Sequence, residues 1–499
     1  MSFQPVILWT DALVWLLVLA CMGFAWHIAR TPALRASWHK VLVRPMGMSS
    51  LAVLALFVLL GLADSLHYRD RLDNGQLDVE VKSVLDIALA PLTAHPERTY
   101  SAPLATHAQS RETVERPDGS VVREAPRLQF GGAHLADPEK DWLGDVLARG
   151  AKGLMLGLFA SLLCVGLLAL ILSTLWRCTF AAALARLRLP QNGDLAWRSL
   201  VLTFALLLLA TGVVASLAGG YHVMGTDKVG QDVLYQTLKS IRTGLVIGTL
   251  TTLVTLPAAI GLGLLAGYFR GWMDDAIQFV YTTLNSIPWV LLVAAAVLIV
   301  QVFIEQNEAS FSSVAERADV RLLALCVIIG LTGWTGLARL LRAETLKLRE
   351  LDYVTAARAF GVSGPRILLR HILPNVQHLI LISVVMDFSG LVLAEAILSY
   401  VGVGVDPVMN SWGNMINAAR LELAREPVVW WPLLAAFSFM FALVLAANLF
   451  ADVVQDAFDP RSGVKHSDDP RSGVKHSDDS RSGVKHTNNP RAAGTEGQA

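Results

Sequence analysis

Nine long apolar stretches constrain the fold of this chain more than any other feature. Crossing the hydrocarbon core of a bilayer takes roughly 20 helical residues, because each residue adds about 1.5 Å to a thickness of about 30 Å. Lipid offers no hydrogen-bond partner to a bare backbone amide, so such stretches are expected to be helices. The sequence therefore predicts an all-α polytopic membrane protein with about nine transmembrane helices, near residues 7–28, 48–65, 153–175, 199–218, 241–268, 280–304, 322–341, 376–398 and 430–451.

The amino-acid composition agrees with a membrane protein. Of the 499 residues, 54% are hydrophobic and 16% are charged, and the mean hydropathy is +0.50. The first stretch could be read as a signal peptide, but its apolar run is too long and no basic segment precedes it, so we expect a lasting membrane anchor. The formal net charge is zero and topology explains the basic residues. The lipid bilayer is thus an expected partner, and nucleic acid is not.

The placement of lysine and arginine predicts which loops are cytoplasmic, because basic residues beside short loops stay on the cytoplasmic side of a membrane. The loops after the first, third and seventh stretches are basic, which agrees with an odd number of spans. We therefore expect the amino terminus outside and the carboxyl terminus in the cytoplasm. The basic residues of the three loops are Arg30, Arg35, Lys40, Arg44, Arg177, Arg186, Arg188, Arg198, Arg342, Lys347, Arg349, Arg358, Arg366 and Arg370.

The two longest segments outside the predicted spans are an insert and a carboxyl-terminal tail. Residues 66–150 form an extracytoplasmic insert, in which the helical spacing of apolar residues between Val81 and Leu92 predicts one amphipathic helix. The insert either packs on the membrane domain or on a delivered partner, or is only partly ordered. Residues 461–499 carry a ten-residue repeat, RSGVKHSDDP, with almost no apolar content, and we expect this tail to be disordered. Its one histidine per repeat is a weak pattern for a metal site, and we predict none.

Several motifs of enzymes and nucleotide-binding proteins are absent from the sequence. There is no G-x-x-x-x-G-K-[ST] phosphate loop, so any use of ATP is expected to need another subunit. No serine, histidine and aspartate set stands out, and we predict neither catalytic residues nor a cofactor. The GLGLLAG sequence, with Gly261, Gly263 and Gly267, resembles a dinucleotide fingerprint but lies inside an apolar stretch without a preceding strand. Close helix packing explains it better.

A basic segment between two spans, Tyr353–Asn375, carries the sequence YVTAARAFGVSGPRILLRHILPN. Its arginines and small residues suit a compact helix-turn-helix that docks to a soluble partner on the cytoplasmic side. The residues that we expect to matter are Tyr353, Ala356, Ala357, Arg358, Gly361, Arg366, Arg370 and Pro374.

This segment resembles the EAA loop of permease subunits of ABC importers, in the variant typical of the oligopeptide and dipeptide (peptide/nickel) transport family and its second-permease, C-type subunits. Three other patches are similar to that family in the same order: MGTDKVGQDV, GLTGWTGLARLLRAETLKLRELDYV and LSYVGVGVDPVMNSWGNMI. Thr355 and Gln231 depart from the family pattern, where an acid and an arginine are frequent. The extracytoplasmic motif residues are Gly225, Thr226, Asp227, Gly230, Asp232, Trp412, Gly413 and Asn414.

The resemblance implies a type I ABC importer permease core of six spans at 199–460, with a coupling loop at 350–375. Residues 1–65 would then form two extra helices, and 151–198 a third extra helix with a basic cytoplasmic loop. In such importers the loop is a coupling helix that seats on an ATPase. Gly361 would permit the turn after that helix, Pro374 would begin the next span, and the arginines would pair with acids of the ATPase.

The family also implies partners, place and cargo. The expected partners are a homologous second permease, two ABC ATPase subunits that bind the ATP, and an extracytoplasmic solute-binding protein. The expected location is the bacterial inner membrane, and the expected activity is import of peptides or peptide-like solutes by alternating access, with hydrolysis outside this chain.

Two intramembrane carboxyls leave an alternative open. Asp387 and Glu395 are eight residues apart in the eighth stretch and are expected to face the bundle interior, because charges in lipid are costly. They either line the passage or hold helices together through hydrogen bonds. The alternative function is an ion-driven secondary transporter, which would favour repeated halves and clustered acids. Neither feature is visible in the sequence.

Overall fold

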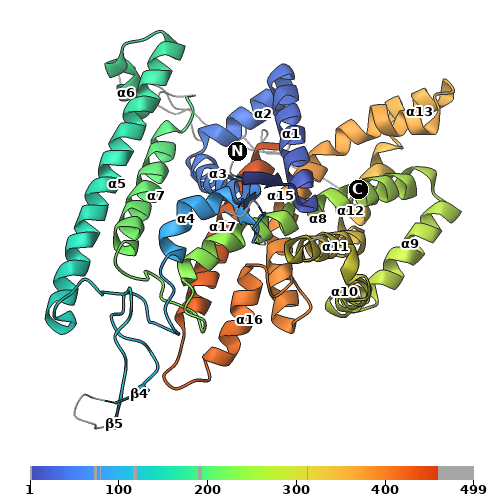
Figure 1. Ribbon diagram of the computed structural model, residues 1–499. Coiled ribbons are helices and arrows are strands. Elements are labelled where there is room, and N and C mark those ends of the chain that lie inside the picture. Colours follow the sequence, from blue (N-terminus) through green and yellow to red (C-terminus); the bar gives the residue numbers. More distant parts are fainter. Residues whose placement is uncertain are drawn as a thin grey trace, which may run out of the picture. The chain divides into compact units, whose positions relative to one another are not determined.

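The computed structural model describes residues 3–71, 76–78, 80–115, 121–188, 194–311 and 313–458. Within these ranges nine helical stretches are long and apolar enough to cross a membrane, which confirms the predicted all-α polytopic class (Figure 1). The predicted tail falls outside the described residues. The nine stretches are α1 (Trp9–Arg30), α3 (Pro45–Asp64), α5 (Pro138–Trp176), α7 (Trp197–Ala218), α8 (Val233–Phe269), α10 (Trp289–Gln306), α11 with α12 (Val314–Gly333 and Thr335–Leu348), Gly364–Val401, and α17 (Trp431–Phe458).

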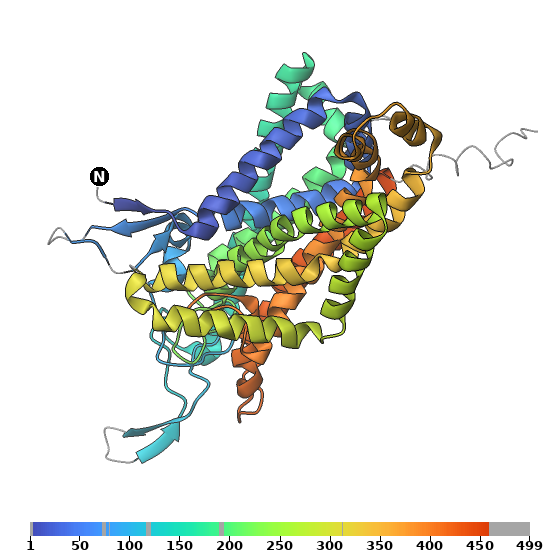
Figure 2. The ribbon, with the colours of Figure 1, turned by 90° about the vertical axis from the view of Figure 1, so that its right-hand side faces the viewer.

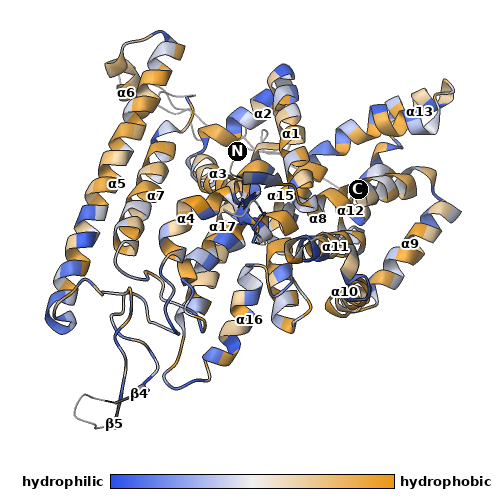
Figure 3. Ribbon diagram, viewed as in Figure 1, coloured by the Kyte–Doolittle hydropathy of each residue, from blue (hydrophilic) through white to orange (hydrophobic). Residues whose placement is uncertain are grey.

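Several helices extend beyond their apolar stretches. α5 begins at Pro138, fifteen residues before the predicted span, so the insert predicted at 66–150 ends earlier than expected. Proline at the first helical turn and acids just after it favour a helix start there. Figure 3 shows this hydrophilic beginning of α5 in blue. α8 likewise starts at Val233 instead of near 241, and its added turns carry polar side chains.

Short elements connect the spans. The helix predicted in the insert is α4, which begins only at Val84 because Ser83 and Asp86 form a capping box. Strands β1, β2 and β3 form an antiparallel sheet in that order, and β4 pairs with β5. Figure 2 shows the β1–β3 sheet at one end of the spanning helices and α13 at the other. These elements are β1 (Phe3–Val6), α2 (Pro32–Val43), β2 (His67–Asp70), β3 (Lys82–Ser83), α4 (Val84–Thr93), β4 (Glu112–Glu115), β5 (Val121–Glu124), α6 (Phe180–Arg188), α9 (Trp272–Asn285), η1 (Glu308–Ser310), α13 (Asp352–Ala359), α14 (Gly364–Ile367), η2 (Leu368–Ile372), α15 (Leu373–Val401) and α16 (Trp412–Glu422).

Helix α8 is the centre of the packing, because α3, α11, α12, α15 and α17 all lie against it. One apolar cluster joins α8, α16 and α17 around Ile241, Trp412 and Trp431. Helix α7, the first predicted helix of the core, packs mainly on α5 and α3, whereas α3 packs on α8 and α17. Helix α3 therefore lies between α7 and the group around α8 and α17, and the core boundary at 199 stays a prediction.

Small residues bring two helices of the centre close together. A Cβ atom at Gly263 would lie 2.7 Å from the carbonyl oxygen of Ala338, and one at Gly267 would lie 2.6 Å from Cβ of Thr345. These distances confirm the predicted close packing of α8 at both positions. Gly261 has no neighbour within 4 Å of such an atom, so the prediction is wrong there.

Candidate functional site

The segment Tyr353–Asn375 forms an elbow at one end of the helical bundle. Helix α13 precedes the bend, and α14 and η2 follow it. Val354 is 2% exposed and Ile367 is fully buried, and both belong to an apolar cluster with Leu341 of α12. Buried apolar contacts thus fix the elbow on the bundle. Its other face is free of the bundle, and Tyr353 is exposed there.

Gly361 makes the bend. Its φ is +76°, a conformation that strains residues with a side chain, and this confirms the predicted turn. The amide of Phe360 donates to the carbonyl of Ala356, and that of Val362 donates to the carbonyl of Ala357 at 3.1 Å. These bonds satisfy carbonyls at the end of α13 that would otherwise lack partners.

Pro374 is the second residue of α15 (Leu373–Val401). It does not mark the beginning of the helical stretch. The helical stretch runs without a break from Gly364 to Val401. The chain forms a wider π-helical turn, η2, directly before Pro374. Proline has no N–H and its ring crowds the preceding turn, and the wider turn leaves room for it. The elbow is therefore continuous with the span that follows.

The elbow carries positive charge without a partner in the described part of the chain. Arg358, Arg366 and Arg370 are exposed, and none forms an ion pair with another described residue. By contrast, Arg342 on the same side of the bundle pairs with Asp274 at 2.6 Å. The Arg342 guanidinium holds the pKa of Asp274 below its usual value despite partial burial. The three elbow arginines can thus bind acids of another protein.

Sequence reasoning missed Phe360, which is 88% exposed beside Gly361. The expected small surface is present next to it, since Ala356 is exposed and Ala357 is half-buried. An aromatic side chain in water at the tip of a basic elbow offers an apolar contact to a partner. The available signal was an aromatic residue directly before a turn glycine in an otherwise polar helix.

At the other end of the bundle, the Gly225–Asp232 motif forms a tight loop between α7 and α8. Gly225 and Gly230 have φ of +71° and +77°, and a side chain on Gly230 would overlap the carbonyl of Glu97. The Thr226 hydroxyl accepts a hydrogen bond from the amide of Ser101 at 2.7 Å. The backbone carbonyl of Thr226 accepts the indole N–H of Trp431 at 2.9 Å. Asp227 accepts the amides of Val229 and Gln231, each at 2.9 Å. The loop therefore joins the insert to α17.

Asp232 caps α8 and binds a buried histidine. One oxygen of its carboxylate accepts the amide of Leu234 at 2.8 Å, and the other contacts Nδ1 of His222 at 2.8 Å. Nε2 of His222 lies 3.7 Å from Oε1 of Glu97, which is ion-pair distance but too long for a hydrogen bond. Burial lowers the pKa of His222, but Asp232 and Glu97 outweigh it and raise the pKa to about 9.

Glu97 is the partner of His222 from the insert. Its carboxylate also accepts the amides of Gln129, Phe130 and Gly131 at 2.8–3.1 Å. Burial alone would raise the pKa of Glu97, yet His222 and these amides lower it to about 2. The insert therefore packs on the membrane domain around Glu97. This is one of the alternatives that the sequence left open for the insert.

The third motif surrounds Glu395. The Ser399 hydroxyl donates to Glu395 at 2.7 Å, and Glu395 is 2% exposed. A Cβ atom on Gly413 would lie 2.7 Å from the Glu395 carboxylate, so α16 passes directly over it. Trp412 donates its indole N–H to the carbonyl of Thr237 at 3.1 Å, and Asn414 donates to the carbonyls of Asp406 and Met409. Glu395 and the Trp412–Asn414 motif thus form one buried latch between α15 and α16.

Asp387 does not share this environment. The expectation that both carboxyls face the bundle interior is wrong for Asp387, which is exposed on the wall of an open groove. Eight residues are about 2.2 helical turns, so the two side chains point about 80° apart. That rotation is enough to place Glu395 under α16 and Asp387 outside the packed core.

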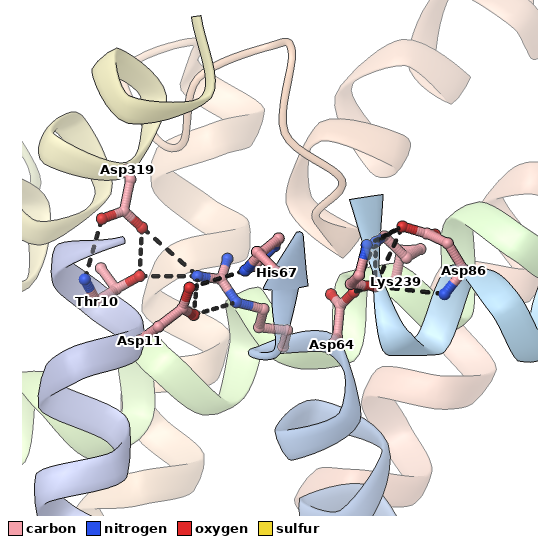
Figure 4. A network of polar contacts seen from close by, with 9 residues as sticks. Thr10, Asp11, Asp64, His67, Asp86, Lys239 and Asp319 are labelled. Atoms are coloured by element: carbon pink, nitrogen blue, oxygen red, sulfur yellow. Dashed lines mark hydrogen bonds and ion pairs between the residues drawn. The ribbon is translucent and has the colours of Figure 1, made fainter. Parts of the chain in front are cut away.

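An ionic network at the end of the bundle opposite the elbow escaped sequence analysis (Figure 4). Arg242 of α8 is buried and donates to Asp11 at 2.6 Å and to the Thr10 hydroxyl at 2.8 Å. Asp319 of α11 accepts the backbone amide and the hydroxyl of Thr10, and His67 contacts Asp11 at 2.8 Å. The signal was charge near the ends of the apolar stretches, but the partners Asp11 and Arg242 lie 231 residues apart in the sequence.

The same face of α8 carries a second cation. The Lys239 ammonium lies 2.6 Å from Asp64 of α3 and 3.0 Å from Asp86 of α4. Burial alone would raise the pKa of Asp86, but Lys239 and the amide of Ser83 lower it. A buried charge left alone costs several kcal/mol, so α8 holds α1, α3 and α4 in place through both bases.

Part of this chain, including two of the motifs described above, matches a known protein family. The family described as "Binding-protein-dependent transport system inner membrane component" matches residues 259–464, which include the elbow, Asp387 and the Glu395 latch. The oligopeptide transport system permease protein OppC of Mycobacterium bovis is 30% identical over 244 residues, which are 49% of this chain and 77% of the relative.

Two further relatives cover a similar extent. The glutathione transport system permease protein GsiD of Pectobacterium atrosepticum is 34% identical over 241 residues, 48% of this chain and 73% of the relative. The dipeptide transport system permease protein DppC of Bacillus subtilis is 28% identical over 240 residues, 48% of this chain and 69% of the relative. About half of this chain is therefore not covered by these relatives.

Proposed function

Because this chain belongs to the family of binding-protein-dependent transport system inner membrane components, we propose that it imports peptides or peptide-like solutes as the permease subunit of an ATP-driven importer. Permease proteins named for oligopeptides, dipeptides and glutathione among its relatives support the cargo class. The nine membrane-spanning stretches supply the transmembrane part.

One observation carries the energy-coupling part of this proposal: the elbow presents exposed Phe360 and arginines that form no ion pair with any described residue, and it is continuous with α15. An ATPase that grips the elbow would move α15 directly, because the helical stretch from Gly364 to Val401 is unbroken. At its far end α15 is held to α16 through Glu395 and Gly413. Force applied at the cytoplasm would thus reach the extracytoplasmic side, as alternating access requires.

The proposal includes partners and an orientation. Two ATPase subunits bind and hydrolyse the ATP, while this chain contributes no catalytic group and no cofactor. A homologous second permease completes the passage, and a solute-binding protein delivers cargo to the extracytoplasmic face. In the bacterial inner membrane the amino terminus lies outside and the elbow and carboxyl terminus lie in the cytoplasm. The basic loops support this orientation.

Co-purification tests the coupling. An affinity-tagged chain should retain its ATPase, and the double reversal Arg358→Glu with Arg366→Glu should lower the retained amount at least about tenfold, because attractive ion pairs become repulsive. The matched control is Arg186→Glu with Arg188→Glu, which reverses two arginines of α6 away from the elbow. Equal retention by all three chains would refute the elbow as the docking site.

A further inference from the structure

A groove halfway along α15 holds the exposed carboxyl of Asp387. The groove has a volume of about 590 Å³ and is lined by residues of α8, α10, α11, α12 and α15. Asp387 lies eleven residues from each end of the apolar stretch at 376–398. Each half of that stretch is about 17 Å long at about 1.5 Å per residue, which places the carboxyl near the membrane midplane.

This position excludes lipid as the neighbour of the groove. A charged carboxyl at the centre of a bilayer costs at least about 2.5 kcal/mol, and such residues face water or protein. Among the described residues Asp387 has no hydrogen bond or ion pair, and no lysine, arginine or histidine lines the groove. The carboxyl is thus available to a group that enters the groove from outside this chain.

Besides the Asp387 carboxylate, the groove wall presents two threonine hydroxyls whose oxygens act as acceptors, and the Ser383 hydroxyl and the Trp289 indole N–H also line it. The Thr252 hydroxyl donates to the carbonyl of Gly248 at 2.7 Å, and the Thr255 hydroxyl donates to the carbonyl of Thr251 at 2.9 Å. Their protons are used, so both oxygens offer only lone pairs to the groove. An ammonium group is the complementary ligand, because it carries three donors and no acceptor. Trp289 also lines the groove, and an indole ring attracts cations.

We propose that this groove is a cation-binding subsite of the translocation passage, in which Asp387 holds a primary ammonium group of the passing solute. The inference rests on the proposed function, and it names the amino terminus of a peptide as the group that is recognised. The apolar part of the wall, including Leu391 and Ile397, accommodates the side chains that follow the ammonium group.

The charge preference of the groove can be measured without knowledge of the cargo. Ser383 lies one helical turn before Asp387 on the same wall. In the assembled importer, with the four native cysteines replaced by serine, Ser383→Cys is labelled with a cationic (trimethylammonioethyl) or an anionic (sulfonatoethyl) methanethiosulfonate. The cationic reagent should react faster, and Asp387→Asn should lower the cation-to-anion rate ratio at least about threefold.

The control Asp452→Asn, which neutralises an exposed carboxyl of α17 outside the groove, should leave the ratio unchanged. An unchanged ratio in Asp387→Asn would overturn the inference.

Transport then tests the ammonium group. Uptake of trialanine is compared with uptake of N-acetyl-trialanine, after binding of each to the solute-binding protein has been measured separately. Asp387→Asn should lower trialanine uptake at least about tenfold and affect the acetylated peptide much less. An equal loss for both peptides, with ATPase assembly intact, would refute amino-group recognition. If the wild type imports neither peptide while the labelling ratio responds to Asp387, the proposed cargo fails and the cation subsite stands.

Discussion

At the scale of single residues, the Gly225–Asp232 motif places an acid from the insert beside a buried histidine and a helix-capping acid. Glu97, His222 and Asp232 come from three different segments and share one charge system. A single network of this kind determines the relative positions of the insert, the α7–α8 loop and α8. Its energy depends on pH because two of its members titrate differently once folded.

The folded insert is predicted to be most stable between about pH 4.5 and 6.5. His222 has a pKa of about 9 instead of 6.5, so its contribution is complete below pH 6.5 and disappears as the pH rises through 9. Glu97 has a pKa of about 2 instead of 4.5, so its contribution is complete above pH 4.5 and disappears as the pH falls toward 2. Above pH 6.5 the loss is on the order of 3 kcal/mol at most, since one pKa unit is about 1.4 kcal/mol.

Limited proteolysis of the insert at a series of pH values measures this dependence. His222→Gln should remove most of the change between pH 6.5 and 9, whereas His107→Gln, which alters an exposed histidine of the same insert, should keep it. The same pH profile in His222→Gln as in the wild type would show that another group titrates.

Residue identity alone predicted some of these positions and not others. Gly361 could be predicted because a glycine that ends a polar helix indicates positive φ. Asp387 and Glu395 could be recognised as costly in lipid, but eight residues of helix turn them to different surroundings, and only the packing of α16 shows which is buried. Phe360 and Arg242 carry local signals, an aromatic residue before a turn glycine and a charge near the end of an apolar stretch, but these signals do not identify the partners of either residue.

At the scale of elements, α8 organises the molecule through both its apolar and its polar residues. Hydropathy predicted the lipid-spanning part of this helix, since lipid demands apolar side chains there. It did not predict the polar turns at Lys239 and Arg242, because their stability depends on acids of α1, α3, α4 and α11 that are distant in sequence. Hydropathy also missed the start of α5 at Pro138, because the first turns of that helix are hydrophilic and are marked by a proline and acids instead.

The contact between α8 and α12 supplies a matched pair of substitutions. Gly263→Ala should destabilise the protein by about 1–3 kcal/mol, because the new methyl group would lie 2.7 Å from the Ala338 carbonyl oxygen. Gly261→Ala adds the same methyl group two residues away with no atom within 4 Å, and should be neutral or slightly stabilising. Thermal unfolding of the detergent-solubilised chains measures both, and equal shifts would contradict the packing of α8 on α12.

At the scale of the whole molecule, the family region and the additional helices form a connected structure. The matched residues 259–464 contain the elbow and α15. The amino-terminal elements join this region through the Arg242 and Lys239 networks, and α3 packs on α8 and α17. Sequence predicted the family and the membrane class. The packing of α3 on α8 and α17, and of α7 on α5, depends on three-dimensional contacts that apolar periodicity does not encode.

Reconstituted transport tests the central claim, that ATP hydrolysis by a neighbouring subunit drives this permease through its cytoplasmic elbow. The complete importer in proteoliposomes should take up trialanine only when ATP is present on the side of the elbow. Gly361→Pro should reduce uptake at least about tenfold, because proline cannot adopt the φ of +76° that the bend requires. Undiminished uptake without ATP, or proton-driven uptake by vesicles that contain this chain alone, would contradict the account.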